Sequence, residues 1–316
     1  MKKLGVAVIG TGFWGRNHAR TYKDLESTNL VAICDVNAER AESVARQFGA
    51  EAYTNSTKML RDTKIEAVSV CTFSTVLAKE ALKALHAGKH VLVEKPMAAS
   101  VKQAEKLLKT AEENRLHLTV GFLMRFIPGL EYMKESITSK KIGDLVSVTA
   151  KRVSQWPERM GDVGVVKDTA IHDIDALRYI TGEDPVTVSA KMGSMQHRKF
   201  EDYAHIMLTY KDGKSAFIES NWVTPYKTRT LIATGSEAIM KLDYMTQELL
   251  IENANETIQP TFPIQEPLKA ELRHFADCIT KRKKPKVTGL DGIKALQIAE
   301  AAIESSAKDK TIRLKY

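Results

Sequence analysis

The residues best suited to chemistry lie in one segment, GVVKDTAIHDIDALRY, which spans residues 164–179. In a helix that turns by about 100° per residue, offsets of four, seven and eleven place four polar side chains on one stripe: Asp168, His172, Asp175 and Tyr179. The opposite stripe is apolar and holds Ala170, Ile174 and Leu177. Since an imidazole exchanges protons near neutral pH and a nearby carboxylate stabilises its charged form, the segment can carry a general base.

The same pattern has an ordinary structural explanation, because a surface helix also carries a polar stripe opposite an apolar one. For this helix alone, a stripe that faces solvent is the simpler interpretation. A catalytic role requires that other elements bring a cofactor and a substrate to the segment.

The N-terminal residues read as a strand, a glycine-rich turn and a helix. Residues 3–9 are a buried-type strand, GTGFWG follows at 10–15, and residues 16–25 contain no proline or glycine. In this context Gly10 permits a tight turn, and Gly12 lets the backbone approach a pyrophosphate at the helix N-terminus. Gly15 allows the helix to pack closely on the strand. The motif predicts a dinucleotide site.

The nucleotide that this site would take is indicated by Asp35. A second strand over residues 30–34 ends at this residue, twenty positions after Gly15. A carboxylate there hydrogen-bonds a ribose 2′-hydroxyl and repels a 2′-phosphate, which favours NAD over NADP. Arg40 follows shortly after this strand, and an ion pair between it and the 2′-phosphate of NADP would weaken that preference.

Strands and helices continue to alternate and predict a parallel, doubly wound Rossmann sheet for residues 1–122. The expected helices are 38–48, 58–61, 77–87 and 100–115, the last capped by Ser100, and the expected strands are 67–72, 90–93 and 116–122. Lys95 precedes Pro96, so its backbone is expected to be extended or cis and its ammonium to lie at the carboxyl end of a strand, where ligands bind. An ordinary strand-end turn explains this lysine equally well.

The second half of the chain, residues 123–316, reads as an α+β domain with a large, mostly antiparallel sheet. The expected strands are 145–152, 186–192, 203–210, 215–221, 230–234, 238–243 and 248–252, with a tight hairpin at Asp212-Gly213. The expected helices are 129–139, 168–180, 268–280 and 291–307. One face of the sheet must be covered by helices, while the other meets solvent or another subunit.

Composition narrows the class of protein. The chain has 316 residues, 43% of them hydrophobic, and no apolar run long enough to span a membrane, so we expect an ordered, cytoplasmic protein. Its three cysteines lack paired spacing, which argues against a disulfide framework and a structural metal site. A net charge of +8 suggests an anionic ligand, although the basic run 281–284 reads as a solvated helix end. No motif for nucleic-acid binding accompanies the charge.

Taken together, the motifs resemble the Gfo/Idh/MocA family of nicotinamide-dependent sugar and polyol oxidoreductases. The resemblance covers nearly the whole chain and is carried by GTGFWG at 10–15, AGKHVLVEKP at 87–96, GF with RF at 121–126, and D-x-x-x-H-x-x-D at 168–175. The segment 152–168 further resembles the branch that oxidises UDP-N-acetylglucosamine at C3. Phe73 and Leu77 depart from the family pattern, which puts in doubt the usual contacts near the nicotinamide ribose.

By this resemblance Lys95, Asp168 and His172 match catalytic positions, and Asp175 matches a substrate-contacting one. Substrate contacts are expected from Asp175, Arg125, Tyr179 and Arg159, with Arg152 a further candidate for an anionic group. Cofactor contacts are expected from Gly10, Thr11, Gly12, Phe13, Trp14, Gly15, Asp35, Arg40, Cys71, Thr72, Glu94 and Lys95. No resident metal is expected. Family members pair through the C-terminal sheet, so the resemblance implies a homodimer or homotetramer.

The leading hypothesis is NAD-dependent oxidation of a secondary hydroxyl on a sugar, with a nucleotide sugar as the favoured substrate. In it, His172 or Lys95 takes the hydroxyl proton while the carbon gives hydride to the nicotinamide, and the helix 168–180 covers the nicotinamide. Oxidation or reduction of a free polyol or aldose is the alternative among enzymes. A sensor that binds nicotinamide without turnover is the alternative from another class, and it has no need of Lys95 and His172.

Overall fold

The computed structural model of the chain describes residues 3–156 and 162–316 and divides into two compact units. Unit 1 comprises Met1–Leu123 and Glu266–Ile293, and unit 2 comprises Met124–Gln265 and Lys294–Tyr316. The division places residues 266–293 with the N-terminal part of the chain, whereas the boundary expected between residues 122 and 123 assigns them to the second domain.

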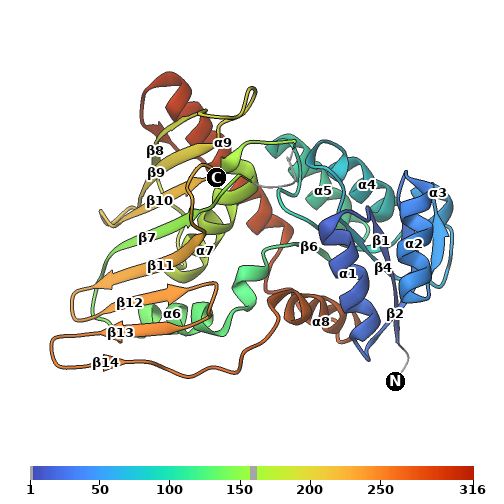
Figure 1. Cartoon of the computed structure of the whole chain (residues 1–316), viewed down its shortest axis with the longest axis horizontal. Helices are drawn as coiled ribbons and strands as arrows, with labels where there is room; N and C mark the ends of the chain where they lie inside the picture. The colour runs from blue at the N-terminus through green and yellow to red at the C-terminus, as the bar shows by residue number, and fades with distance from the viewer. Residues whose placement is uncertain (1–2, 157–161) are drawn as a thin grey trace. The chain divides into compact units, whose positions relative to one another are not determined.

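Unit 1 is built on a six-stranded parallel sheet with the order β3-β2-β1-β4-β5-β6. Its strands are β1 (Leu4–Ile9), β2 (Thr28–Cys34), β3 (Glu51–Tyr53), β4 (Ala67–Val70), β5 (His90–Val93) and β6 (Leu118–Val120). The four strands β1, β4, β5 and β6 are buried along most of their length, as expected where helices cover both faces. The predicted doubly wound sheet is confirmed (Figure 1).

Helices lie on both sides of this sheet. They are α1 (Phe13–Asp24), α2 (Ala38–Phe48), α3 (Ser56–Met59), α4 (Ser74–His86), α5 (Val101–Glu113) and α8 (Pro267–Thr280). Ser100 caps α5, as predicted, because its side chain accepts a hydrogen bond from the Gln103 N–H. Gly49 ends α2 in the left-handed conformation that glycine adopts without strain.

Helix α8 belongs to unit 1 because its apolar face completes the core beneath α1 and α2. Leu268, Leu272 and Phe275 pack in one hydrophobic cluster with residues of β1, β2, α1 and α2, including Tyr22 and Val44. The periodicity of α8 predicts the helix correctly, but it cannot say which sheet the apolar face covers.

Unit 2 is built on a nine-stranded sheet with the order β14-β13-β12-β11-β7-β10-β9-β8-β15. Its strands are β7 (Leu145–Val153), β8 (Thr187–Gly193), β9 (Tyr203–Thr209), β10 (Ser215–Asn221), β11 (Thr228–Gly235), β12 (Ile239–Asp243), β13 (Leu249–Glu252), β14 (Thr257–Ile258) and β15 (Ile312–Arg313). Only the β7–β10 pair among these is parallel. The predicted α+β class is confirmed, with the hairpin at Asp212-Gly213 joining β9 to β10.

The helical segments of unit 2 are η1 (Leu123–Phe126, a 3₁₀ turn that begins one residue before the unit), α6 (Pro128–Thr138), η2 (Val166–Ala170, a π-helical turn) and α7 (Ile171–Thr181). Helix α9 (Gly289–Lys308) continues from unit 1 into unit 2. Helices α6 and α7 lie against one face of the sheet (Figure 1). On β9 the residues facing them are buried, while His205 and Met207 point to the other face and are exposed. No helix within the described ranges is long and apolar enough to cross a membrane.

The role of α8 in unit 1 gives a first prediction. Phe275 is fully buried in the shared cluster, so Phe275→Ala should lower the free energy of unfolding by about 3–5 kcal/mol. Urea denaturation measures this loss. Arg273→Ala, at an exposed position on the same helix, should change the free energy by less than about 0.5 kcal/mol. Equal effects of the two substitutions would contradict the packing of α8 into this core.

Candidate functional site

The glycine turn of unit 1 is as close-packed as backbone atoms allow. Gly10 has φ of +88°, and a Cβ added there would lie 2.8 Å from the Cys71 carbonyl oxygen at the end of β4. A Cβ added at Gly15 would lie 1.7 Å from the Gly10 carbonyl oxygen. Both glycines are therefore required by the space available, and the N-terminus of α1 is left beside the turn, where its first N–H groups can meet phosphates. These features fit a bound dinucleotide.

Asp35 holds this turn as well as marking the end of β2. Its carboxylate accepts hydrogen bonds from the Thr11 N–H and hydroxyl, both at 2.8 Å, and from the Asn37 N–H at 2.9 Å. The Nε atom of Arg40 lies 3.7 Å from the Oδ1 atom of Asp35. Burial would raise the pKa of the Asp35 carboxyl, but the hydrogen bonds from Asn37 and Thr11 outweigh it and lower the pKa. Asp35 is thus ionised at neutral pH, as the predicted preference for NAD requires.

Substitution of Asp35 gives a second prediction. Asp35→Ala removes the carboxylate that repels a 2′-phosphate and also the acceptor that anchors Thr11. NADH affinity should fall by about tenfold or more, since hydrogen bonds to a charged group contribute about 1.5–3 kcal/mol each, while the ratio of NADPH to NADH affinity rises. Fluorescence titration with each cofactor measures both changes. Glu39→Ala, an exposed control on α2, should leave both affinities unchanged.

The remaining cofactor candidates lie along the same edge of the sheet. Trp14 is half-buried, and the exposed Phe13 packs edge-on against it at 5.5 Å. Thr72 directly follows Cys71, whose thiol pKa is raised by burial and by the nearby charges of Glu94 and Glu271. A protonated, buried thiol gives Cys71 a packing role.

Glu94 and Lys95 follow β5, as predicted. Glu94 is buried and lies 3.0 Å from the Nε2 atom of His18, whose Nδ1 atom lies 3.0 Å from the Ser69 hydroxyl. The other Glu94 oxygen accepts a hydrogen bond from the Lys95 N–H at 3.2 Å. The Lys95–Pro96 peptide bond is cis, and the Lys95 side chain is half-buried. A buried network thus fixes the backbone from which Lys95 projects.

In unit 2, the segment with the proton-transfer pattern is helical but is not a surface helix. Asp168 lies in the π-helical turn η2, and His172, Asp175 and Tyr179 lie in α7. Nearly every residue of α7 is buried, including the members of both stripes that it carries, while Asp168 in η2 is half-buried. The interpretation of a polar stripe facing solvent is therefore wrong. The wider turn at Asp168 is a difference from the single α-helix that the spacing predicts, and such turns often occur at functional sites.

Two buried ion pairs fix α7. Arg125 donates to both carboxylate oxygens of Asp175, at 2.8 and 2.6 Å, and Arg152 donates to both oxygens of Asp173, at 2.8 Å each. Asp173 is fully buried, and Asp175 is 1% exposed. The sequence predicts substrate contacts from Asp175, Arg125 and Arg152. The ion pairs give these residues a structural function as well. Asp173 was not predicted, because no spacing in the sequence links it to Arg152.

Tyr179 lies between two cations. The Arg125 guanidinium is 4.9 Å and the Lys134 ammonium 4.1 Å from the centre of its ring. Burial raises the pKa of Tyr179 to about 12, with a further contribution from Glu131 and an opposing one from Arg125. The phenol is therefore neutral at physiological pH and can donate a hydrogen bond.

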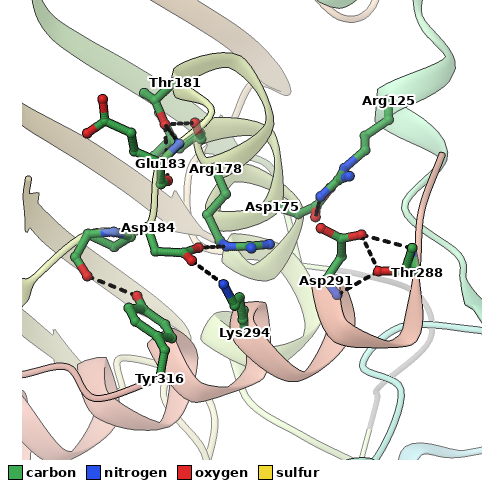
Figure 2. A network of polar contacts seen from close by, with 12 residues as sticks. Arg125, Asp175, Arg178, Thr181, Glu183, Asp184, Thr288, Asp291, Lys294 and Tyr316 are labelled. Carbon is green, nitrogen blue, oxygen red and sulfur yellow. Dashed lines mark hydrogen bonds and ion pairs between the residues drawn. The ribbon is translucent and has the colours of Figure 1, made fainter. Parts of the chain in front are cut away.

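The C-terminal end of α7 is held by a second polar network, which Figure 2 shows. The Arg178 Nε atom donates to Asp184 at 2.6 Å, and Lys294 of α9 donates to the other Asp184 oxygen. The Tyr316 hydroxyl donates to the Pro185 carbonyl at 3.0 Å. This network ties α7 to α9 and to the end of the chain.

The sequence-predicted residues thus fall into two sets. Asp168, His172, Asp175, Tyr179 and Arg125 are brought together around α7 in unit 2. Lys95 and the cofactor candidates belong to unit 1. Arg159 lies outside the described residues. Among the residues described, no group of three or more histidine, cysteine, aspartate or glutamate side chains is arranged to hold a metal ion.

The pair between Arg125 and Asp175 gives a third prediction. Arg125→Ala leaves the Asp175 carboxylate buried without this partner, and breaking such a pair costs about 3–5 kcal/mol of stability. Chemical denaturation measures it. Lys308→Ala, which removes an exposed pair with Glu304, should cause no measurable change. An Arg125→Ala protein as stable as wild type would show that the pair does not stabilise α7.

Comparisons with known proteins agree with the geometry. An oxidoreductase family described as having an NAD-binding Rossmann fold matches residues 4–122, and the GFO/IDH/MocA C-terminal domain matches residues 130–241. The chain is 27% identical to UDP-N-acetylglucosamine 3-dehydrogenase of Acidithiobacillus ferrooxidans over 309 residues, which cover 95% of this chain and 96% of that one. It is 28% identical to scyllo-inositol 2-dehydrogenase (NAD(+)) of Bacillus subtilis over 326 residues, which cover 98% and 95%.

Solved structures show the same fold. The Acidithiobacillus ferrooxidans enzyme aligns with a TM-score of 0.89 over 97% of this chain and 99% of that chain. An oxidoreductase from Agrobacterium radiobacter in complex with NAD+, L-tartaric acid and magnesium aligns with a TM-score of 0.90 over 99% and 98%, at 22% identity. The second likeness bears on the fold alone.

Proposed function

This chain belongs to the GFO/IDH/MocA family of oxidoreductases, and on that premise we propose that it oxidises a secondary hydroxyl of a nucleotide sugar with NAD as hydride acceptor. The broader prediction, a nicotinamide-dependent oxidoreductase acting on CH–OH groups, is confirmed by that membership. The proposed substrate is of the UDP-N-acetylglucosamine kind, and the product is a keto sugar. The observation that carries the proposal is the similarity, along nearly all of both chains, to a UDP-N-acetylglucosamine 3-dehydrogenase.

The proposed chemistry assigns a role to each of three side chains. His172 takes the hydroxyl proton as general base, and Asp168 stabilises the resulting imidazolium. Lys95 hydrogen-bonds the reacting oxygen and stabilises developing alkoxide, or takes the proton itself. A dinucleotide held through its pyrophosphate at the glycine turn would supply the nicotinamide as acceptor for the hydride from that carbon. Burial of α7 supports this assignment, because fixed side chains hold a reacting geometry better than mobile ones.

The cofactor preference rests on Asp35. Its lowered pKa keeps a negative charge where the 2′-phosphate of NADP would lie, and Arg40 is the nearby cation that can offset this charge. NAD is therefore the proposed cofactor.

Oxidation of a free polyol is the second candidate, and the similarity to scyllo-inositol 2-dehydrogenase (NAD(+)) favours it. The two substrate classes differ in charge. Competition by UDP with the substrate separates them, since UDP should inhibit an enzyme for nucleotide sugars and leave an inositol dehydrogenase unaffected.

The open face of the nine-stranded sheet supports pairing with a second copy of the chain. Met207, Phe217 and Ile239 are 39–44% exposed there, and apolar surface of this kind commonly marks an interface. A homodimer or homotetramer through this sheet is proposed. The cytoplasmic location expected from the sequence stays a prediction.

The catalytic assignment gives a fourth prediction. His172→Ala and Lys95→Ala should each lower kcat by about 10²–10⁴-fold, the usual contribution of a proton-transferring group, while NADH still binds to His172→Ala. The absorbance of NADH formed from UDP-sugars, free sugars and inositols measures turnover. The matched controls are His86→Ala and Lys79→Ala, at exposed positions on α4, and should retain full activity. Unchanged turnover in both active-site variants would overturn the assignment.

A further inference from the structure

A row of polar residues crosses the α7-facing side of the nine-stranded sheet. Arg229 of β11 lies directly opposite Arg152 of β7, and Arg152 lies directly opposite Ser220 of β10. Directly opposed residues of neighbouring strands point to the same face. Since Arg152 reaches Asp173 of α7, the side chain of Arg229 also points to the side where α7 lies.

The two neighbouring arginines differ in their partners. Arg152 is 3% exposed and uses its guanidinium on both oxygens of Asp173. Arg229 is half-buried and has no ion pair or side-chain hydrogen bond with any residue in 3–156 or 162–316. Burial and the positive charge of Arg152 lower the pKa of Arg229 to about 10, while Asp173 and Asp168 act in the opposite direction. Arg229 thus remains charged at neutral pH in a place where its charge is poorly compensated.

Lys227 adds a third positive charge to the same end of the sheet. Its pKa is lowered by Arg229, by burial and by Arg152, which places it within the field of both arginines. Strand β10, which lies on the other side of β7 from β11, continues into Trp222, whose ring N–H donates to the Thr169 hydroxyl of η2 at 2.9 Å. Asp168 of the same turn is one of the two carboxylates that act on the pKa of Arg229, so the charge of this proposed catalytic residue is felt by the cationic group.

We propose that Arg229, assisted by Lys227, binds an oxyanion of the substrate, namely a phosphate of the nucleotide sugar. The proposal deepens the proposed function and rests on it for the identity of the substrate. The planar guanidinium of Arg229 supplies paired donors that match two phosphate oxygens, and Lys227 contributes a point charge from the edge of the strand. A phosphate placed there would neutralise the excess of positive charge that Arg152 and Asp173 leave uncompensated. A neutral polyol would leave this positive charge uncompensated.

The test measures anion binding directly, on the full chain with saturating NADH. Isothermal titration with UDP, inorganic pyrophosphate and uridine is carried out on wild type, Arg229→Gln, Arg229→Lys, Lys227→Gln and Lys211→Gln. Lys211 is an exposed lysine of the hairpin between β9 and β10, at the opposite end of β10 from Ser220, so it serves as the charge-matched control. Melting temperature and NADH affinity report whether each variant keeps its fold.

The expected result is that UDP and pyrophosphate bind wild type and that uridine binds far more weakly. Arg229→Gln should weaken the binding of UDP and pyrophosphate by about 10- to 100-fold, the range for losing a charged hydrogen-bonding partner. Arg229→Lys should restore part of that loss of affinity. Lys227→Gln should weaken this binding less, and Lys211→Gln should have no effect. Added salt should reduce the difference between wild type and the Arg229 variant.

Failure of this inference can be told from failure of the proposed function. Equal binding of UDP and pyrophosphate to wild type and Arg229→Gln, or no binding to either, would overturn the anion site. Arg229-dependent binding of UDP without oxidation of any UDP-sugar would support the anion site and overturn the proposed substrate. Oxidation of a UDP-sugar with unchanged KM in Arg229→Gln would support the function and overturn the role of Arg229.

Discussion

The placement of α7 depends on two arginines that neutralise two buried carboxylates. Asp173 and Asp175 are two residues apart, and so about 200° apart around the helix at about 100° per residue. Arg152 reaches one from β7 and Arg125 reaches the other from η1. Because the two ion pairs hold opposite sides of the helix, they fix its rotation as well as its distance from the sheet. His172 directly precedes Asp173 in this helix, so the two ion pairs also fix the direction in which it projects.

In unit 1, a single carboxylate serves two purposes. Asp35 must be negative to discriminate between cofactors, and the same charge accepts the hydrogen bonds that hold Thr11 and therefore the glycine turn. The backbone at this point has no room to adjust, since a methyl group at Gly15 would overlap the Gly10 carbonyl. Cofactor preference and the shape of the turn are thus coupled through a single side chain.

The elements with strong local patterns were predictable, and the long-range contacts were not. Residues 38–48 form α2 as predicted, because apolar periodicity and the capping residues agree over this stretch. The short strands β3, β14 and β15 were missed, since two or three residues carry no periodicity and are strands only through their neighbours. The spacing from Asp168 to Asp175 indicated the candidate site, but it could not reveal the π-helical turn or the pairing of Arg152 with Asp173. Both arise from contacts between segments far apart in the sequence.

The net charge of +8 is weak evidence for an anionic ligand by itself. Four of the basic residues lie in the exposed run 281–284 at the end of α8, where water solvates them at little cost. Arg125 and Arg152 also have internal carboxylates that use their charge. What distinguishes Arg229 is its position beside another arginine on the half-buried side of the sheet, without a carboxylate of its own among the described residues. The location of a positive charge and the groups that compensate it, rather than the total, indicate where an anion binds.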